Sequence, residues 1–590
     1  METKPNNYVD EVHNQNYYSK YNSPLITHEE IIFDRFRRKE SLNSNWNFEI
    51  DEHDTFLRAE WYKEKLKDEK GLDLPYDFSF DNWKEMYVPS CWNTSNRDYF
   101  YYEGIAIYTR TFKYINKGES RVFIKFGAVN YEARVFLNKK FIGYHKGGST
   151  PFFIEVTDGL LEDNRIHIVV NNKRSNEKVP MENFDWFNYG GVYRDVEFIR
   201  LEQNFIKDFN IALANNSDFK KIKVQLKVDG DRLEGKALMK ITELNIFKEI
   251  VLENGRGNIE FDAQPELWSP ENPKLYEVQV QYCEDEIKDK VGFREIKIEG
   301  ADIYLNGKKI FLKGINCHEE SLENGKTISE EEILENLKLA KELNCNFMRL
   351  VHYPHTEKTA MLADELGIML WEEIPVYWAI DFENPLTIGD AQNQLKELIK
   401  RDINRASVII WSVGNENADT DTRLKFMKDL VDISRELDPT RLVSAACVSG
   451  GTKNIINDRL AEYLDIIGIN EYYGWYRPDF SKLPQFFENS KPGKPVVITE
   501  FGGGALANFR GTVDEMFTED RQEAIYKKQV KVLGGIPYIK GISPWILYDF
   551  RSPRRKNKFQ KGYNLKGLLS KDKKHKKLAF YVMKEFYEKF

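Results

Sequence analysis

The sequence predicts a multidomain protein with three folded domains in a row: a jelly-roll-like β-sandwich, an immunoglobulin-like β-sandwich and a C-terminal (β/α)8 TIM barrel. Two observations predict this order. Short runs of alternating polar and apolar residues, separated by turn residues, continue to about residue 299 and are typical of antiparallel strands with one wet face. Beyond residue 300, apolar runs alternate with helical segments, which is the pattern of a parallel barrel.

The composition indicates an ordinary globular protein. Of its 590 residues 41% are hydrophobic and 31% are charged, which is ample for several cores. The net charge of −8 argues against nucleic acid as a partner. The first residues lack the apolar stretch of a signal peptide, and no run approaches the length of a membrane span. We therefore expect a cytoplasmic protein without membrane association.

The cysteines suggest neither a disulfide framework nor a metal site. The chain has five, an odd number, and they are scattered without a Cys-x-x-Cys pair. The histidines show no spacing that favours a metal either. We expect reduced thiols, no metal and no cofactor.

The first 299 residues divide into three parts. Residues 1–40 are polar and rich in tyrosine, and we expect them to form an N-terminal arm. Residues 41–204 contain short alternating runs and predict the first sandwich. Residues 205–299 contain near-perfect alternation, at Lys221 to Val228 and at Tyr276 to Tyr282, and predict the immunoglobulin-like sandwich.

Residues 300–590 contain eight candidate barrel strands, a number and length that fit one TIM barrel. A helix is well marked between the first two strands, because Ser329 and Glu332 can form a capping box before an apolar stripe. The predicted strands are Ile310 to Ile315, Asn346 to Val351, Ile368 to Glu372, Val408 to Val413, Leu442 to Ala446, Ile466 to Ile469, Val496 to Thr499 and Gly541 to Leu547.

Two of these strands lead directly into a glutamate. The run VIIWSVGNE ends at Asn415 and Glu416, and the run VVITE ends at Glu500. Barrel enzymes carry their chemistry at the carboxyl ends of the strands, so both glutamates should reach the same rim. A single glutamate there could equally begin a solvated loop, but a pair suits the two-carboxylate chemistry of glycoside hydrolysis.

The other predicted strand ends supply more polar side chains to this rim, and more carboxylates than one mechanism needs. The pattern alone does not identify which two react. These side chains are His318 and Glu319, His352 and Tyr353, Glu372 and Glu373, Asn470 to Tyr473, and Trp545 with Asp549.

Two long segments make a family resemblance specific. Asn346 to Leu370, NFMRLVHYPHTEKTAMLADELGIML, and Asp402 to Glu416, DINRASVIIWSVGNE, resemble the two signature motifs of glycoside hydrolase family 2, whose members have this domain order. The resemblance implies that Glu416 is the general acid/base and Glu500 the nucleophile of a retaining reaction. It also implies that Asn415 binds the sugar 2-hydroxyl and that Tyr472 donates a hydrogen bond to the nucleophile.

The basic segment Arg551 to Lys577 bears on the substrate, since it has twelve Lys or Arg and one acid. Within it, Asn564-Leu565-Lys566 resembles an Asn-x-Lys pair with which β-glucuronidases of this family bind the sugar carboxylate.

Two further stretches, Asn470 to Tyr476 (NEYYGWY) and FDWFNYGG with Asp185, resemble segments that line the sugar pocket in these β-glucuronidases. The candidate members of this pocket, with rim residues from the strand ends, are Asp185, His318, His352, Asn415, Tyr472, Tyr476, Trp545, Asn564 and Lys566.

The expected substrates are β-glucuronide conjugates or glucuronic-acid-ended oligosaccharides, from which the enzyme would remove the terminal sugar. We expect the protein to be a homo-oligomer. One departure keeps β-galacturonides open, because Gln560 and Lys561 stand where some β-glucuronidases have an arginine. A β-galactosidase of the same family and a non-catalytic sugar-binding protein remain as alternatives.

The short segment Ile374 to Asp390 lacks an insertion that covers the aglycone in some β-glucuronidases of the family. The lack of this cover favours bulky aglycones.

Overall fold

The computed structural model describes residues 17–68, 70–115, 120–448 and 454–590. Residues 1–16 of the predicted arm lie outside this range. The chain forms two compact units: unit 1 contains residues 1–174, 188–205 and 324–327, and unit 2 contains residues 175–187, 206–323 and 328–590. The following paragraphs take each unit by itself.

Unit 1 is a β-sandwich. Among its described residues, six strands form a sheet in the order β3-β2-β4-β10-β7-β8, and four form a second sheet in the order β1-β12-β5-β9. Trp46, Phe48 and Tyr108 are buried in the core with aliphatic side chains of both sheets. The strands are β1 Lys39–Ser41, β2 Ser44–Ile50, β3 Lys84–Val88, β4 Ile105–Lys113, β5 Arg121–Phe126, β6 Val129–Asn130, β7 Glu132–Leu137, β8 Lys140–Lys146, β9 Phe152–Glu155, β10 Asp163–Asn171, β11 Gly191–Val192 and β12 Val196–Leu201; the short helices are η1 Tyr17–Tyr21, η2 His28–Glu30, α2 Thr55–Arg58, η3 Trp61–Lys63, η4 Phe80–Asn82, α3 Trp92–Ser95, η5 Arg97–Tyr99 and η6 Thr157–Gly159.

The described part of the predicted arm packs on this sandwich. Tyr21 is buried with its ring 5.6 Å from those of Phe136 and Phe141. Ile31 and Ile32 are buried in an apolar cluster of the same unit. Residues 17–32 therefore add apolar surface to the sandwich core, which the polar composition of this stretch did not indicate.

In unit 2, the segment that follows the sandwich forms two antiparallel sheets, in the orders β13-β14-β17 and β16-β15-β18-β19. Burial alternates residue by residue along β14 and β18, as the sequence predicts for strands with one wet face. The strands are β13 Phe205–Leu213, β14 Lys221–Asp229, β15 Gly235–Ile241, β16 Ile246–Leu252, β17 Arg256–Asp262, β18 Tyr276–Tyr282 and β19 Asp285–Val291, with η7 Thr242–Leu244.

The barrel is one closed parallel sheet. Its order within the described residues is β23-β31-β30-β29-β28-β27-β26-β25-β24, and both end strands come from the same short stretch of chain, so the sheet closes on itself. The strands are β23 Leu312–Lys313, β24 Asn316–His318, β25 Phe347–Val351, β26 Met369–Glu373, β27 Val408–Asn415, β28 Leu442–Val448, β29 Ile466–Asn470, β30 Val496–Glu500 and β31 Ile539–Ile542; β20 Ile296–Glu299, β21 Asp302–Leu305 and β22 Lys308–Ile310 precede them, and β32 Phe550–Arg551 and β33 Tyr563–Asn564 form a late hairpin.

Two predicted strands differ from the observed ones. The first is split at Gly314, where a Cβ would come within 3.0 Å of Phe347, Ser543 and the Ile542 carbonyl, so the chain passes too close to its neighbours for a regular strand. The last ends at Ile542 and does not continue to Leu547, because Pro544 has no N–H to donate to a ladder.

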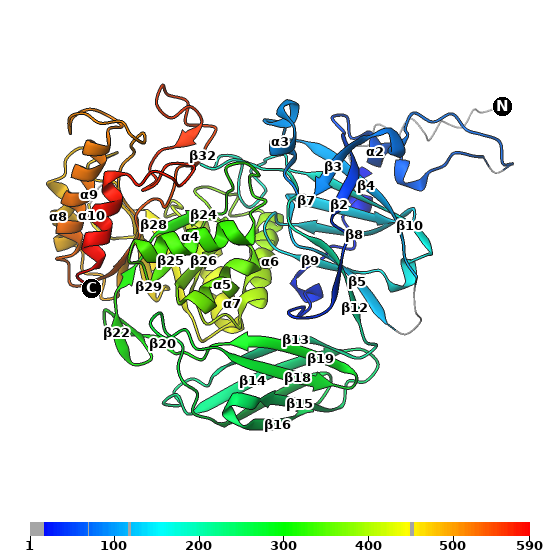
Figure 1. The fold of residues 1–590 in the computed structure, drawn as a ribbon, viewed down its shortest axis with the longest axis horizontal. Helices are drawn as coiled ribbons and strands as arrows, with labels where there is room; N and C mark the ends of the chain where they lie inside the picture. The colour runs from blue at the N-terminus through cyan, green and yellow to red at the C-terminus, as the bar shows by residue number, and fades with distance from the viewer. Residues whose placement is uncertain (1–16, 69, 116–119, 449–453) are drawn as a thin grey trace. The chain divides into compact units, whose positions relative to one another are not determined.

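Helices surround the barrel, as Figure 1 shows for α4 to α7. The predicted capping box is present: the Ser329 side chain accepts from the Glu332 N–H, and the Glu332 side chain accepts from the Ser329 N–H. The helices are α4 Glu330–Glu342, α5 Glu357–Leu366, α6 Pro385–Asp402, α7 Asp421–Leu437, η8 Arg459–Glu462, α8 Lys482–Asn489, α9 Glu519–Leu533 and α10 Leu578–Tyr587.

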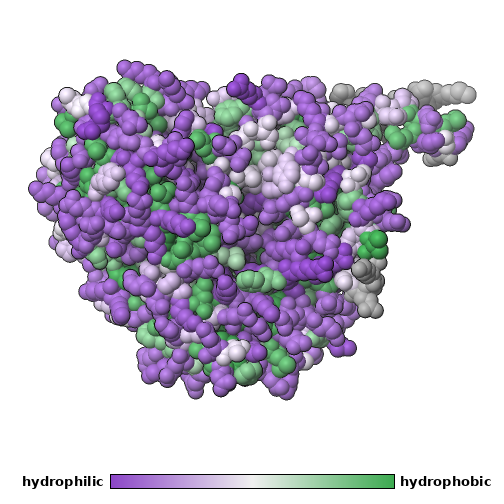
Figure 2. All heavy atoms as spheres, viewed as in Figure 1, coloured by the Kyte–Doolittle hydropathy of each residue, from purple (hydrophilic) through white to green (hydrophobic). Residues whose placement is uncertain are grey.

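The face of the molecule drawn in Figure 2 is mainly hydrophilic. Figure 2 shows apolar side chains on the visible face only in scattered groups. Within the described residues, none of the helices has the length and apolar character needed to cross a membrane.

Candidate active site

Glu416 follows the last residue of β27, a strand that is buried along its whole length. Its backbone has φ = 53°, a left-handed conformation that is uncommon for a residue with a side chain and is concentrated at functional sites. The indole N–H of Trp378 donates to Glu416 Oε2 at 2.8 Å. The strand therefore brings Glu416 to the rim and Trp378 orients its carboxylate.

Glu500 ends β30 and is only 5% exposed. Tyr472 donates its hydroxyl to Oε2 at 2.7 Å, and Arg349 donates to Oε1 at 3.1 Å. Burial, and next the negative charge of Glu416, raise the pKa of Glu500 to about 7, while Arg349 and Tyr472 act in the opposite direction. The negative charge of Glu416 therefore acts on the Glu500 carboxyl.

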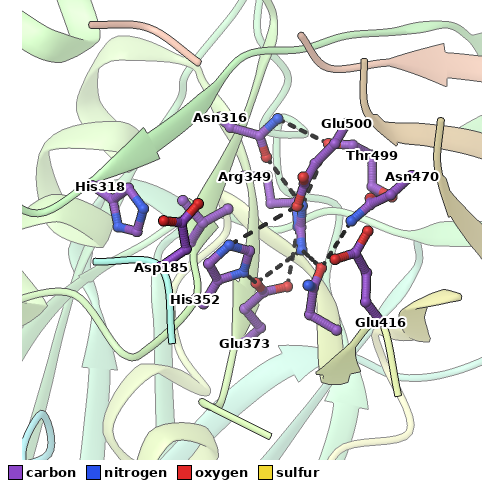
Figure 3. A network of polar contacts seen from close by, with 12 residues as sticks. Asp185, Asn316, His318, Arg349, His352, Glu373, Glu416, Asn470, Thr499 and Glu500 are labelled. Carbon is purple, nitrogen blue, oxygen red and sulfur yellow. Dashed lines mark hydrogen bonds and ion pairs between the residues drawn. The ribbon is translucent and has the colours of Figure 1, made fainter. Parts of the chain in front are cut away.

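Arg349, from the middle of β25, connects the polar side chains at this end of the barrel. Its guanidinium donates to Glu500, to both oxygens of Glu373 at 3.0 and 3.1 Å, and to Asn415 Oδ1 at 2.8 Å. Figure 3 shows Glu373 and Glu500 bonded to this one guanidinium, with Glu416 beside the network. Because Arg349 is fully buried, its bonds fix the orientation of the groups around it.

Asn415 has one polar atom left for a ligand. Its Oδ1 accepts from Arg349 and, at 3.2 Å, from Asn470. Its buried Nδ2 has no hydrogen-bond partner among the described residues. A buried donor without a partner is costly, so a bound ligand that offers an oxygen would be favoured there.

Aromatic rings line the same end of the barrel. His352 donates its Nδ1–H to the Glu373 carboxylate at 2.8 Å and stacks on Trp545 at 5.1 Å between ring centres. His318 lies 5.5 Å from Trp545 and bonds Tyr353 at 3.2 Å. Burial lowers the pKa of His352, which outweighs the opposing effect of Glu373. These flat apolar surfaces suit the faces of a sugar ring.

A second group of polar residues surrounds Asp185, which belongs to unit 2. Its carboxylate accepts from Ser552 at 2.6 Å, from two nitrogens of Arg555, and from Asn564 at 3.4 Å. Arg555 also donates to the Tyr476 hydroxyl at 3.1 Å. The loop after β32 and the segment around Asp185 are therefore fixed to each other.

Lys566 completes this group. Only 3% of the residue is exposed, and its ammonium donates to the Tyr476 hydroxyl at 2.8 Å and lies 5.3 Å from the centre of the Tyr472 ring. No carboxylate of the described residues lies within ion-pair distance of it. Since Tyr472 also binds Glu500, the buried cation is one side chain away from this carboxylate.

Comparison with known proteins identifies the family of this chain. Three family models match consecutive parts of the chain: the sugar binding domain of glycosyl hydrolases family 2 at residues 39–202, a further family 2 domain at residues 203–294, and the TIM barrel domain at residues 296–590. The chain belongs to glycoside hydrolase family 2. The resemblance predicted from the two motifs, the predicted fold class and the prediction of a glycoside hydrolase are confirmed.

Individual relatives have more than one specificity. A β-glucuronidase from Streptococcus agalactiae is 26% identical over 95% of this chain and 96% of its own. A β-galactosidase from Thermoanaerobacterium thermosulfurigenes is 30% identical over 87% of this chain and 71% of its own. A β-galacturonidase from Eisenbergiella tayi, in a crystal structure bound to galacturonate, is 25% identical to this chain, with a TM-score of 0.81 over 97% of this chain and 99% of its own.

The sequence did not single out four residues of this site. Arg349 carried a signal, because a lone charge in an apolar strand has to be paired. Trp378 lies in the predicted short segment Ile374 to Asp390. Glu373 was recognised only as one of several rim carboxylates. Arg555 was one of twelve basic residues, and nothing in that run singled it out. The four are Arg349, Glu373, Trp378 and Arg555.

Glu471, next to Tyr472, gives a testable pH dependence of stability. Burial raises the pKa of its carboxyl to about 8, against smaller effects of the Tyr473 N–H, Arg477 and Gln529. Because the folded state binds this proton more tightly than the unfolded chain, the resulting stability is present below the ordinary pKa near 4.5 and is lost as the pH rises through about 8.

We therefore expect Glu471→Gln, which cannot ionise, to gain thermal stability relative to the wild type as the pH is raised from 5 to 8, by up to about 1.4 kcal/mol per pH unit. Melting temperatures of both proteins across this range provide the measurement. Glu488→Gln, which changes an exposed carboxylate of α8, should track the wild type. If the melting temperature of Glu471→Gln decreased relative to that of the wild type as the pH rises, the raised pKa would be contradicted.

Proposed function

We propose that this family 2 enzyme hydrolyses β-D-glucuronides from the non-reducing end and releases glucuronic acid with retention of configuration. The observation that carries the proposal is Lys566, a buried ammonium without a carboxylate partner among the described residues. A buried charge is unfavourable unless it is paired, and the C6 carboxylate of a uronic acid would supply the missing anion. A neutral galactoside would leave the cation unpaired.

Neighbouring residues support binding of the same sugar. Asn564 lies two residues before Lys566 and is fully buried, so it can add a hydrogen bond to the carboxylate or to a nearby hydroxyl. The free Nδ2 donor of Asn415 suits the sugar 2-hydroxyl. Trp545 and His352 present a stacked aromatic surface to the ring. Tyr476 binds Lys566, and Asp185 binds Arg555 from the loop between β32 and β33.

The reaction proceeds in two steps. In the first, Glu500 attacks the anomeric carbon, the bond to the aglycone oxygen breaks, and Glu416 gives its proton to this oxygen. In the second, Glu416 takes a proton from water, which attacks the anomeric carbon and releases Glu500. Arg349 and Tyr472 each hold one oxygen of Glu500, and both favour the ionised carboxylate that the first step needs.

Formation of the glycosyl-enzyme also explains how Glu416 changes its role. Glu416 gives up its proton in the first step, so it enters the second step as the carboxylate that takes a proton from water. The same pair thereby serves both steps.

A second candidate substrate is a β-galacturonide, which carries the same carboxylate and differs at one hydroxyl. The galacturonidase relative favours it, as does Gln560 at a position where some β-glucuronidases have arginine. Arg555, from the same loop, supplies an arginine beside Tyr476 and Lys566 and supports the glucuronide instead.

The test is a comparison of kcat/KM for p-nitrophenyl β-glucuronide, β-galacturonide and β-galactoside with the purified protein. We expect the glucuronide to be the best substrate and the galactoside the poorest. A preference for the galacturonide would select the second candidate, and a preference for the galactoside would refute both uronide proposals. Absence of hydrolysis of all three would contradict the proposed reaction.

A further inference from the structure

The loop between β32 and β33 is a local concentration of positive charge in an acidic protein. Residues 552–562 contain no Asp or Glu, whereas the whole chain has a net charge of −8. Four cations of this loop are exposed: Arg554, Lys556, Lys558 and Lys561. Opposite charges attract each other over a Debye length of about 8 Å, so this loop favours anionic molecules in its vicinity.

Arg554 is the cation of this loop that the structure connects to Glu416. The centre of its guanidinium lies 4.7 Å from the centre of the Trp378 ring, within the range of a cation–π interaction. The indole N–H of the same Trp378 donates to Glu416 Oε2 at 2.8 Å. One indole ring thus separates the exposed guanidinium from the carboxylate that we propose as the acid/base.

Trp378 is itself held firmly, so Arg554 stacks on a fixed surface. Its backbone N–H donates to the Asn415 carbonyl at 2.9 Å, and its carbonyl accepts from the Asn417 side chain at 2.8 Å. Both partners flank Glu416 in the sequence. The position of Trp378 relative to Glu416 is therefore determined by short-range contacts.

Unlike its two neighbouring arginines, Arg554 has no carboxylate partner among the described residues. Arg551 pairs with Glu320, and Arg555 pairs with Asp185. Within the part of the chain that the structure describes, no carboxylate lies within 4.0 Å of the Arg554 guanidinium. A guanidinium that is preoriented by stacking, exposed and unpaired is well suited to bind an anion.

The side of the site on which Arg554 lies determines which part of a bound substrate, the sugar or the aglycone, carries this anion. A general acid donates to the oxygen that links the sugar to its aglycone, so the aglycone lies on the Glu416 side of the scissile bond. Lys566, in contrast, is joined through Tyr472 to Glu500. The connection from β26 to α6 is short, residues 374–384, and Trp378 lies in it.

Resting on the function proposed above, we propose that Arg554, stacked on Trp378, forms an aglycone site for an anionic group, a carboxylate or a sulfate carried by the residue next to the glucuronic acid. The preferred substrates are then polyanionic saccharides that end in glucuronic acid. Lys556, Lys558 and Lys561 extend the positive charge beyond this first contact.

Matched aryl glucuronides test the proposal. In the first pair the aglycone is a phenol with a meta carboxylate or a meta carboxamide, and in the second it is a phenol with a meta sulfonate or a meta sulfonamide. For each pair, the ratio of kcat/KM for the anionic substrate to that for the neutral one is measured in the wild type and in Arg554→Gln. Comparing the ratios between proteins cancels differences between the leaving groups.

We expect Arg554→Gln to lower the ratio by about fivefold, the upper range for an exposed ion pair, and Arg554→Lys to restore part of it. The wild-type ratio should also decrease as salt is raised. Lys528→Gln, which removes one exposed positive charge from α9, should leave the ratio unchanged. The pair with the larger decrease in Arg554→Gln identifies carboxylate or sulfate as the preferred anion.

Hydrolysis of the neutral glucuronides with equal ratios in the wild type and Arg554→Gln would overturn this inference and leave the proposed function intact. A decrease of the same size in Lys528→Gln would also overturn it, because the effect would then reflect net charge. Failure to hydrolyse any glucuronide, the neutral ones included, would instead refute the proposed function.

Discussion

Glu500→Ala is expected to lose hydrolysis of every glucuronide, because no other group can form the bond to the anomeric carbon. The loss should be equally complete for an aryl glucuronide with a good leaving group and for an alkyl glucuronide with a poor one. Sodium azide should restore turnover by entering the space of the missing carboxylate, and the product should be the α-glycosyl azide, since the azide attacks from the face opposite the leaving group.

Glu416→Ala should behave differently. Aryl glucuronides with good leaving groups need little protonation and should keep more activity, while alkyl glucuronides should lose about 10²- to 10⁴-fold in kcat/KM. Azide should here intercept the glycosyl-enzyme and give the β-glycosyl azide. The stereochemistry of the two azides, read by NMR, therefore distinguishes nucleophile from acid/base.

Glu471→Gln is the matched control for both variants. This carboxylate is also buried at a strand end, but its oxygens bind the Tyr473 N–H and Gln529. We expect it to retain most of the activity. Equal sensitivity to the leaving group in Glu500→Ala and Glu416→Ala, or the same azide anomer from both, would contradict the assigned roles.

Lys566→Met is expected to remove the preference for uronides. The substitution keeps the apolar length of the side chain and deletes the charge. We therefore expect kcat/KM for p-nitrophenyl glucuronide to decrease roughly 30- to 1,000-fold, which corresponds to a free energy of about 2 to 4 kcal/mol. The matching glucoside, which has no carboxylate to leave unpaired, should change little. Asn564→Ala should have the same direction of effect.

Lys571→Met provides the control for this change, because it removes a positive charge from an exposed position in the same basic segment. We expect it to affect both substrates alike and weakly. If Lys566→Met reduced glucuronide and glucoside hydrolysis equally, Lys566 would have a structural role and the substrate assignment would be wrong.

The architecture could be predicted from the sequence because each class of element leaves a local pattern. The alternating burial along β14 and β18 follows from one wet face, and the fully buried, mainly apolar β27 follows from having none. The glutamates could be named because barrel strands bring their carboxyl ends to one rim, so Glu416 and Glu500 needed no long-range information. Their roles remain predictions that the variants above test.

Contacts between distant segments could not be predicted in this way. The bonds of Arg349 join four strands of the barrel, and only the closed sheet brings their ends together. Arg555 approaches Asp185 over 370 positions in the sequence, and Trp378 reaches Glu416 over 38. The break in the first strand at Gly314 likewise depends on how closely neighbouring strands approach.

The most direct test of the account is the anomer first released from p-nitrophenyl β-D-glucuronide, followed by proton NMR in the first minutes of the reaction. If Glu500 forms a glycosyl-enzyme and Lys566 binds the carboxylate, the wild type should release β-glucuronic acid, which then converts slowly to the α form. Initial release of the α anomer would show inversion and contradict the covalent mechanism. Absence of any glucuronic acid would contradict the central claim that the site is built for a uronide.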